Sequence, residues 1–414
     1  MTAESPTFID LFSGAGGLSL GFKRAGWTSL LAVDIWADAI RTYQHNFSPE
    51  WLERHEERLL ERGRKTLLAD MFKDDAKQAI LNELGSERPD WVIGGPPCKG
   101  FSTVGKRDRN DPRNRLVEEF ADVVEMLMPK GFLIENVLGL RDMKFVGGVV
   151  KRFQALGYTV TPAILKAAEY GVPQLRRRII FVGTQSGLAF KKPAPIRSEG
   201  TFTTVWDAIC DLPPLGPGAF SEAYSGAPKN SFQRSMRSGS AQLQGHEASN
   251  HPDHLIEAIS HIPDGGNRRH IPDRLQPKSG FHNSYSRLNS RSPAVAVTQN
   301  MGKPSATRCI HPFQHRGLTA REGARLQTFP DWFHFQGGLV SQREQIANAV
   351  PPMLAEIIAV ALRDPASWSA IVEEAVAWNG MALDGEFVGR DDSVDEDDHE
   401  PAAQMPLFTL TSTA

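Results

Sequence analysis

The feature that most constrains the fold is the alternation, over residues 7–185, of short apolar runs with amphipathic or charged stretches. The apolar runs are TFIDLF, SLLAVD, WVIGG, GFLIENV and RIIFVG, and stretches such as IWADAIRTYQHNF lie between them. Short apolar runs separated by helical patterns are typical of parallel strands that helices cover on both faces. We therefore predict an α/β fold with a doubly wound, mostly parallel sheet.

The rest of the chain departs from this alternation. Residues 186–317 are rich in Pro, Gly, Ser, Asn and His and show little periodicity, which predicts a smaller, loop-rich domain. Helical periodicity returns over 318–383, in LTAREGARLQTF and QREQIANAVPPMLAEIIAVALRD, and we expect these helices to rejoin the domain of residues 1–185. Residues 384–414 are acidic and then rich in Thr, Pro and Ala, which is typical of a disordered tail.

The formal net charge of -3 conceals an uneven distribution. Residues 384–400 hold nine Asp and Glu against Arg390, so their net charge is -8 and the remaining residues carry about +5 by difference. Residues 191–316 hold 15 Lys and Arg against 9 Asp and Glu, a net charge of +6. This moderately basic middle is consistent with a polyanionic partner and equally with an ordinary solvated surface.

Three cysteines, Cys98, Cys210 and Cys309, are an odd number at wide spacing with no CxxC pair. This usage argues against a disulfide framework and a structural zinc site, and it fits a reducing cytoplasm. The N-terminus lacks the basic and then apolar pattern of a signal peptide. The chain also contains no run of 18 apolar residues, the length that could cross a bilayer. We expect a cytoplasmic protein with no bound metal and no membrane segment.

Cys98 stands in the string GGPPCKGFS (94–102), directly after an apolar run. Prolines restrict φ and lack an amide donor, whereas glycines allow a ligand to approach the backbone closely. Packing alone does not require this combination. The string therefore predicts a stiff loop that presents one free thiol to a bound substrate.

The string FSGAGG (12–17) follows the first apolar run, at the turn where a doubly wound sheet binds nucleotide-like ligands. Its spacing differs from the GxGxxG of dinucleotide sites, which disfavours an NAD-dependent dehydrogenase. Asp34 and Asp70 end later apolar runs, where carboxylates can hold ribose hydroxyls or an adenine amine. Each Asp alone could instead be a helix cap or a turn former. Together these features favour an adenosine-containing cofactor.

Two further polar groups lie at predicted strand ends. The string ENV (135–137) places a carboxylate at the mouth of the sheet, where burial can keep it protonated near neutral pH. In QLRRR (174–178), alternation along a strand puts Gln174, Arg176 and Arg178 on one face. Arginines on an apolar strand need anionic or carbonyl partners, and ion pairing across the sheet is the alternative to a substrate role.

These motifs, followed by NAV (348–350), occur in an order that resembles the cytosine-C5 DNA methyltransferase family. The resemblance covers roughly residues 7–365 and includes the strings GVPQLRRR, LTAREGARLQTFP and IANAVPP. It implies an S-adenosylmethionine-dependent enzyme with a Rossmann-like catalytic domain. Residues 1–185 and 318–383 would form that domain, and residues 186–317 would be the target-recognition domain.

The resemblance also implies four catalytic residues. Cys98 would add as a thiolate to carbon 6 of a cytosine, which makes carbon 5 nucleophilic. Because a free cysteine is only a few per cent thiolate at neutral pH, the loop would have to favour its deprotonation. Glu135 would protonate, or hydrogen-bond to, ring nitrogen 3, and Arg178, with Arg176 beside it, would hold the exocyclic carbonyl. The base that removes the proton from carbon 5 is not identified by the sequence.

Contacts to the methyl donor carry over onto the first turn, the strand ends and the returning helices. They fall on Phe12, Gly14, Ala15, Gly16, Gly17, Leu18, Asp34, Ile35, Asp70, Met71, Pro97, Leu116, Asn348 and Val350. Two positions depart from the family pattern: Asp34 replaces the more usual glutamate, and Lys99 follows the cysteine where glutamine is common. We expect the shorter carboxylate to be tolerated, and Lys99 to contact a phosphate or to alter closure of the cysteine loop.

The implied substrate is duplex DNA, from which the target cytosine must be swung out of the stack. Basic residues of 186–317 would neutralise phosphates, and side chains within 265–291 would read base edges in the major groove. A transfer-RNA cytosine methyltransferase, which shares the catalytic domain, is the alternative enzyme. A non-catalytic DNA-binding relative is disfavoured because all four catalytic residues are present.

The family further implies the modification half of a restriction system, paired with a cognate restriction endonuclease, or an orphan enzyme. A self-contained site favours a monomer at the nucleoid of a bacterial cytoplasm. The string from Gln404 to Phe408, QMPLF, resembles the short peptide by which bacterial proteins dock on the replication sliding clamp. A random apolar patch in the tail is the alternative.

Overall fold

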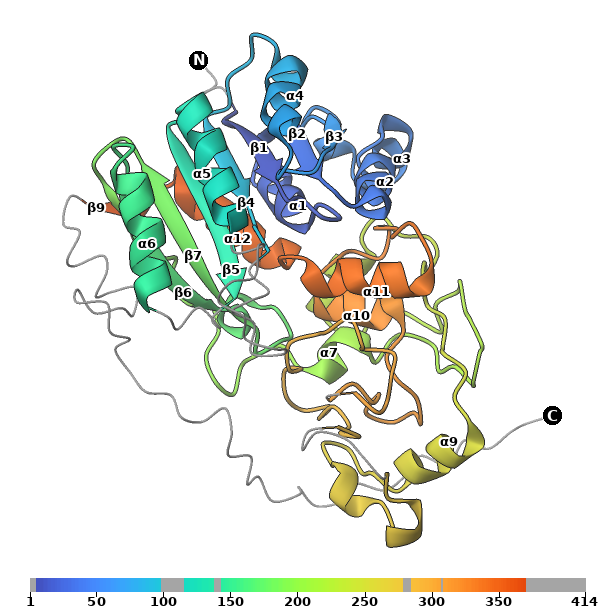
Figure 1. Cartoon of the computed structure of the whole chain (residues 1–414). Coiled ribbons are helices and arrows are strands. Elements are labelled where there is room, and N and C mark those ends of the chain that lie inside the picture. Colours follow the sequence, from blue (N-terminus) through green and yellow to red (C-terminus); the bar gives the residue numbers. More distant parts are fainter. Residues whose placement is uncertain (1–4, 98–114, 138–142, 278–283, 307, 370–414) are drawn as a thin grey trace.

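The computed structural model describes residues 5–97, 115–137, 143–277, 284–306 and 308–369 (Figure 1). Cys98, the tail of residues 384–414 and the string from Gln404 to Phe408 lie outside these ranges. The predictions made for them therefore remain predictions.

Seven strands form one sheet, in the order β3-β2-β1-β4-β5-β7-β6. β1 pairs in parallel with β2 and β4, β2 with β3, and β4 with β5, whereas β7 runs antiparallel between β5 and β6. The predicted α/β fold with a mostly parallel sheet is confirmed. The strands are β1 Thr7–Leu11, β2 Thr28–Asp34, β3 Thr66–Leu68, β4 Trp91–Gly94, β5 Gly131–Val137, β6 Thr159–Lys166 and β7 Arg177–Thr184.

The antiparallel direction of β7 has a simple cause in chain connectivity. Between β5 and β6 the chain passes through the helix α6, as a parallel crossover requires. Between β6 and β7 it makes a short connection, residues 167–176, that returns the chain antiparallel. β6 was absent from the predicted strands. Its sequence contains Pro162, and the structure places it at the sheet edge, where proline is tolerated.

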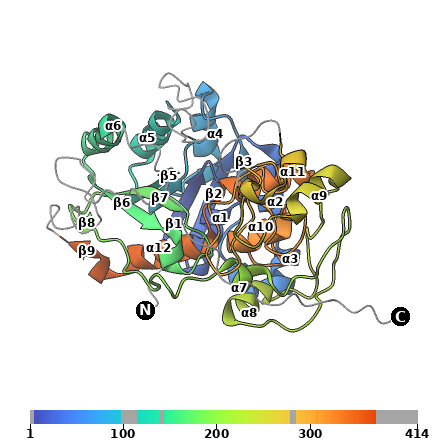
Figure 2. The ribbon, with the colours of Figure 1, turned by 90° about the horizontal axis from the view of Figure 1, so that it is seen from below.

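Helices cover both faces of the sheet, with α4, α5 and α6 on one face and α1 and α12 on the other (Figures 1 and 2). Neighbouring residues of β1 point to opposite faces: Ile9 packs with α4 and α5, and Phe8 packs with α1 and α12. The helices are α1 Gly17–Arg24, α2 Ala37–Asn46, α3 Pro49–His55, α4 Asp74–Leu84, α5 Leu116–Leu127, α6 Met143–Gln154, α7 Val205–Ile209, α8 Ser231–Arg237, α9 Asp253–Ser260, α10 Ala320–Leu326, α11 Leu339–Asn348 and α12 Pro352–Arg363. Short 3-10 helices span Glu57–Leu59, Ala167–Tyr170, Arg268–His270, Asp273–Leu275 and Pro365–Ser367, and a two-stranded ladder joins β8 Ala189–Phe190 to β9 Trp368–Ser369.

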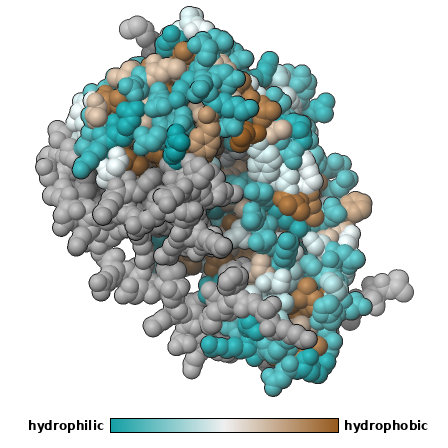
Figure 3. Space-filling view, in the orientation of Figure 1, coloured by the Kyte–Doolittle hydropathy of each residue, from teal (hydrophilic) through white to brown (hydrophobic). Residues whose placement is uncertain are grey.

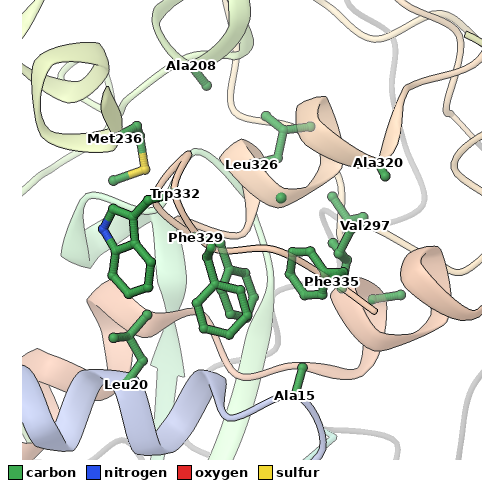
Figure 4. Close-up of a cluster of buried hydrophobic side chains, with 14 of the residues drawn as sticks. Ala15, Leu20, Ala208, Met236, Val297, Ala320, Leu326, Phe329, Trp332 and Phe335 are labelled. Atoms are coloured by element: carbon green, nitrogen blue, oxygen red, sulfur yellow. The ribbon is translucent and has the colours of Figure 1, made fainter. Parts of the chain in front are cut away.

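The loop-rich middle of the chain shares a core with the helices that follow it. α10 packs against both α7 and α11. In Figure 4, Phe329 and Trp332 lie between Leu20 of α1 on one side and Met236 and Leu326 on the other, and all five side chains belong to one buried cluster. α10 and α11 thus complete the core of the middle segment, while α12 returns to the sheet against α1. The domain boundaries drawn from the sequence remain a prediction.

Buried ion pairs join the segments of this loop-rich part. Arg325 is fully buried, and its guanidinium lies 2.7 Å from Asp331 Oδ2 and 3.0 Å from Asp211 Oδ1. Glu322 accepts two hydrogen bonds from Arg316, of 2.8 and 2.7 Å. Removing one partner of such a pair leaves an uncompensated buried charge, which costs about 3–5 kcal/mol. These pairs therefore strongly restrict how segments with little regular structure can pack.

The hydropathy of the surface and of one long apolar stretch indicates which parts of the protein contact solvent. On the face shown in Figure 3 the described residues are mostly hydrophilic, and apolar residues form small separate groups. Residues 339–363 are long and apolar enough to cross a membrane, but 67% of their most apolar part is buried inside the protein. This stretch comprises α11 and α12, and a buried core helix passes the same test.

Asp10 of β1 is a buried carboxyl group that should make stability depend on pH. Burial raises its pKa from 3.8 to about 7, although Ser19 Oγ donates a 2.6 Å hydrogen bond to it and Lys23 lies nearby. Since the folded protein holds this proton to higher pH than the unfolded chain, the stabilising effect of the protonated group is complete below 3.8 and is lost as pH rises to about 7.

We expect Asp10→Asn to remove this part of the pH dependence, so that the variant gains stability over wild type as pH rises from 5 to 8. Thermal unfolding followed by circular dichroism at both pH values checks it. The same change in Tm with pH in both proteins would contradict the expectation.

Candidate active site

The sheet register brings the predicted site residues to one edge. Leu11, the last residue of β1, pairs with Val33 of β2 and with Gly94 of β4. Gly94 in turn pairs with Ile134 of β5, and Val137 of β5 pairs with Arg178 of β7. Several predicted site residues therefore lie at the same edge of the sheet. The glycine-rich turn (residues 12–17), Asp34, the segment leading to Cys98 and Glu135 lie at or near the carboxyl ends of parallel strands, and Arg178 lies at the start of the antiparallel β7.

The turn after β1 has an unusual backbone and very little room. Phe12, Gly14 and Gly16 have φ values of 59°, 53° and 92°, in the left-handed region that favours glycine. A Cβ on Gly16 would lie 2.7 Å from the Tyr43 ring, and one on Gly17 would lie 2.4 Å from the carbonyl oxygen of Val350. A Cβ on Gly14 would meet nothing within 4 Å among the described residues. Packing within the protein thus requires glycine at positions 16 and 17. Of the three glycines in this turn, Gly14 is the one that borders open space among the described residues.

Asp34 at the end of β2 organises this turn. Its carboxylate accepts hydrogen bonds of 2.7 Å from the Gly14 amide and 2.8 Å from the Trp36 amide. Burial raises the pKa of Asp34, and these backbone hydrogen bonds oppose the rise. The sequence left open a ligand contact or a turn-forming role for Asp34; the structure shows the turn-forming bonds, and the bond to Gly14 was not foreseen. The next residue, Ile35, has its side chain 63% exposed, as an apolar surface beside the carboxylate.

The remaining residues predicted to hold the methyl donor differ in accessibility. Asp70 lies two residues beyond β3 and accepts a hydrogen bond from the Phe72 amide at 3.1 Å. Pro97 and Asn348 are exposed. Five side chains are buried in the hydrophobic cores, so any contact they make to a ligand would have to come from their backbone or from a small exposed edge. These five are Ala15, Leu18, Met71, Leu116 and Val350.

Glu135 and Arg178 form an ion pair, with 2.7 Å between Arg178 Nε and Glu135 Oε1. Both side chains are only 12% exposed, so the charges are largely removed from water. Burial lowers the pKa of Arg178, and Glu135 opposes this effect. Ion pairing across the sheet, the alternative that the sequence left open, is therefore present, and it uses the same two groups that the resemblance assigns to the substrate.

Asn136 connects this pair to the segment before Cys98. Its Nδ2 donates a 3.0 Å hydrogen bond to the carbonyl oxygen of Pro96. Cys98 itself lies outside the described residues, but the backbone two residues earlier is thereby tied to the residue after Glu135. Sequence reasoning gave Asn136 no role. The signal that could have suggested one is an amide side chain directly after the strand-end glutamate.

Arg176 faces a different part of the protein from Arg178. β7 begins at Arg177, so Arg176 and Gln174 precede the strand instead of alternating along it, and Gln174 forms an isolated bridge with Ala294. Arg176 is 3% exposed and donates to the carbonyl oxygens of Ala347 and Ala349, at 3.1 and 3.2 Å. Its buried Nε has no hydrogen-bond partner within the described part of the chain. Burial lowers the pKa of Arg176, and the positive charge of Arg178 lowers it further.

The family model for C-5 cytosine-specific DNA methylases matches residues 6–364. The chain belongs to this family. This methylase is 40% identical over 364 residues to the type II methyltransferase M1.HphI of Haemophilus parahaemolyticus, with 86% of this chain and 87% of that one covered. It is 37% identical to M.DdeI of Desulfomicrobium norvegicum, with 85% and 87% covered.

Solved structures show the same fold for this methylase. A protein described as a DNA modification methyltransferase encoded within an E. coli prophage matches with a TM-score of 0.68 and 27% identity, covering 86% of this chain and 98% of that one. The Dnmt2 methyltransferase of S. pombe matches with a TM-score of 0.54 and 17% identity, covering 86% and 98%. The second likeness concerns the fold alone.

The surroundings of Gly14 suit the methyl donor that the family implies. S-adenosylmethionine carries a ribose, an adenine ring and a charged sulfonium. Open space beside Gly14, the carboxylate of Asp34 and the exposed apolar side chain of Ile35 are of the kinds that these groups require. In the described part of the methylase, no group of three or more His, Cys, Asp or Glu side chains could hold a metal ion.

Proposed function

We propose that this methylase transfers a methyl group from S-adenosylmethionine to carbon 5 of a cytosine within a short sequence of duplex DNA, using Cys98, Glu135, Arg176 and Arg178. The observation that carries this assignment is the buried ion pair of Glu135 and Arg178, which adjoins the residue that holds the segment leading to Cys98. Addition to a pyrimidine ring requires a nucleophile, which Cys98 would supply, and a buried acid, which Glu135 would supply.

Each proposed catalytic residue has a defined task. The Cys98 thiolate adds to carbon 6 of the ring, and the displaced electron pair makes carbon 5 nucleophilic. Glu135 donates a proton or a hydrogen bond to nitrogen 3 as the sulfur adds, so that negative charge does not build up on the ring. S-adenosylmethionine supplies the methyl group. Loss of the carbon 5 proton to a base and cleavage of the sulfur–carbon bond then restore the ring and the thiolate.

In this proposal the substrate competes with Glu135 for Arg178. In the free protein the carboxylate is neutralised by Arg178 at 2.7 Å. A cytosine carbonyl that accepts hydrogen bonds from Arg178 would weaken the hold of this arginine on Glu135. A buried carboxyl group that loses its cation is protonated more readily. Arg178 would thus both orient the base and release Glu135 for proton donation.

The donor would be held by backbone and side chains around the glycine-rich turn. Gly14 would border it directly, Asp34 would accept from ribose hydroxyls, and Ile35 would pack on the adenine. Asp70 would accept from the adenine amine, and Asn348 would approach from the end of α11. Phe12, Ala15, Gly16, Gly17, Leu18, Met71, Pro97, Leu116 and Val350 would complete the surroundings.

Residues 186–317 would act as the target-recognition domain on a catalytic domain built from 1–185 and 318–383. The type II names of the relatives support a role in modification paired with a cognate restriction endonuclease, and an orphan role is the alternative. We place the protein in the bacterial cytoplasm as a monomer at the nucleoid, without a bound metal. The segment from Gln404 to Phe408 would dock on the replication sliding clamp.

The test is incubation of the full chain with tritiated S-adenosylmethionine and either duplex DNA or transfer RNA. Label is expected in duplex DNA, and bisulfite sequencing of DNA from a methylation-free host that expresses the protein should show 5-methylcytosine at one short sequence. Label in transfer RNA alone would replace the proposed substrate by the alternative one.

A further inference from the structure

The carboxyl-terminal end of α11 is closed by side chains from distant parts of the chain. The last carbonyl groups of a helix have no partner within the helix. Here the carbonyl oxygen of Ile346 accepts from Gln327 Nε2 at 2.6 Å, and that of Ala347 accepts from Arg176 Nη1 at 3.1 Å. The carbonyl oxygen of Ala349, just beyond the helix, accepts from both side chains, at 3.2 Å each. The positive guanidinium also meets the partial negative charge of the helix end.

Gln327 is in turn held by Gln174, and both side chains are fully buried. Gln174 Nε2 donates to Gln327 Oε1 at 2.9 Å and to the carbonyl oxygen of Leu326 at 2.6 Å. Gln174 Oε1 accepts from the amide of Val297 at 2.9 Å. We call this pair, Gln174 and Gln327, the glutamine bridge. It runs from Val297 of the middle segment to the end of α11, and each amide uses both its donor and its acceptor.

The segment that the bridge holds lies against the glycine-rich turn. Asn348 is exposed and stands between Ala347 and Ala349, whose carbonyl oxygens are bonded. The approach to the turn is so close that a Cβ on Gly17 would lie 2.4 Å from the Val350 oxygen and 3.2 Å from Ala349 Cβ. The backbone at the end of α11 is thus in direct contact with the glycine-rich turn. The position of Asn348 relative to Gly14 therefore depends on what holds the end of α11.

We propose that Gln327 is a positioning residue for methyl-donor binding, which it serves by holding residues 348–350 against the glycine-rich turn. This inference rests on the proposed function, in which Asn348 contacts the donor. Through Gln174 the same bridge joins the donor side of the site to the segment proposed to read DNA. Gln327 touches neither the donor nor the cytosine in this assignment.

A glutamine is needed because both ends of its amide are used in a buried place. Methionine has nearly the same length and shape but cannot form these bonds. Gln327→Met would leave the carbonyl oxygen of Ile346 and the Gln174 amide with one partner fewer, and buried polar groups that lose a partner tend to rearrange. The end of α11 is then free to move away from the turn.

The experiment uses the full chain and the probe S-adenosylhomocysteine, titrated by calorimetry without DNA. We expect Gln327→Met to bind the probe at least about tenfold more weakly and to raise KM for S-adenosylmethionine, with a smaller change in kcat. Gln342→Met is the matched control, since Gln342 lies on α11, the helix whose far end Gln327 holds, and among the described residues its side chain donates to the carbonyl oxygen of Gly337, just before that helix. The control should bind like wild type.

A purely structural role would give a different result. It would lower Tm and the fraction of active protein but leave the affinity of the folded fraction and KM unchanged, and this result would overturn the proposal. If Gln327→Met does not fold, Gln327→Asn serves instead, because it keeps the amide but is one methylene too short to reach both sides. Unchanged affinity in a folded Gln327→Asn would then overturn the proposal.

Asn348→Ala separates failure of this inference from failure of the proposed function. Weak binding by both Asn348→Ala and the Gln327 variant supports the bridge. Weak binding by Asn348→Ala with normal binding by the Gln327 variant overturns the bridge alone. Normal binding by both overturns the bridge because the donor does not lie where the proposed function puts it.

Discussion

Replacing Cys98 by serine is expected to abolish methyl transfer, lowering kcat by about 10⁴-fold or more, as removal of a nucleophile does in other enzymes. A serine hydroxyl is not ionised near neutral pH, so addition to carbon 6 would stop. Single-turnover labelling of duplex DNA with tritiated S-adenosylmethionine measures the loss. Undiminished labelling by the variant would show that the thiol is not the nucleophile.

Cys210 provides the matched control for this substitution. Cys210 and Cys309 are free thiols whose pKa values are raised by burial, for Cys309 to about 12. Raised pKa values keep both thiols protonated and unreactive. Duplex DNA containing 5-fluorocytosine should therefore form a covalent adduct with wild type and with Cys210→Ser but not with Cys98→Ser. An adduct with Cys98→Ser would contradict the assignment.

The second large effect is expected from Glu135→Gln, which should lower kcat by about 10²–10⁴-fold. Glutamine has the same shape and can still accept from Arg178, but it cannot deliver a proton to nitrogen 3. Binding of S-adenosylhomocysteine should stay within about twofold of wild type, because Glu135 is not among the residues proposed to hold the donor. Calorimetry and single-turnover rates separate the two effects.

Glu135→Gln also removes one charge of a buried pair, so loss of stability has to be separated from loss of chemistry. Arg24 and Glu56 form a pair at 2.7 Å, with side chains 12% and 10% exposed, and the more exposed Arg58 also contacts Glu56. Arg24 is the last residue of α1, and the glycine-rich turn precedes the first residue of that helix, so Arg24 lies at the far end of α1 from the turn. Glu56→Gln should lower Tm by a similar amount without slowing methyl transfer. Equal slowing in both variants would mean that Glu135 acts through folding.

The sequence predicted the buried central strands, and it also predicted β7 and the edge strand β3. β1, β2, β4 and β5 are short, nearly continuous apolar runs, because a central parallel strand packs against helices on each side. β6, an edge strand that contains Pro162, was missed, and the direction of β7 was not foreseen because it depends on the connection from β6.

The candidate site divides in the same way. Asp34 and Glu135 lie at one edge because parallel strands end at the same side, and this could be predicted from their places after apolar runs. The hydrogen-bond partners of Arg176 and Gln174 could not be predicted from the sequence. Their hydrogen bonds reach Ala347 and Val297, which lie more than 100 residues away along the chain.

The amino-acid sequence by itself determined the α/β class, the order of the motifs and the residue types available for chemistry, because apolar periodicity and turn residues act over a few neighbouring positions. Only the tertiary structure decided that Arg178 pairs with Glu135, that Arg176 instead closes the end of α11, and that Gly17 lies against Val350. Such pairings follow from how separate segments pack, and packing depends on the whole core rather than on any local pattern.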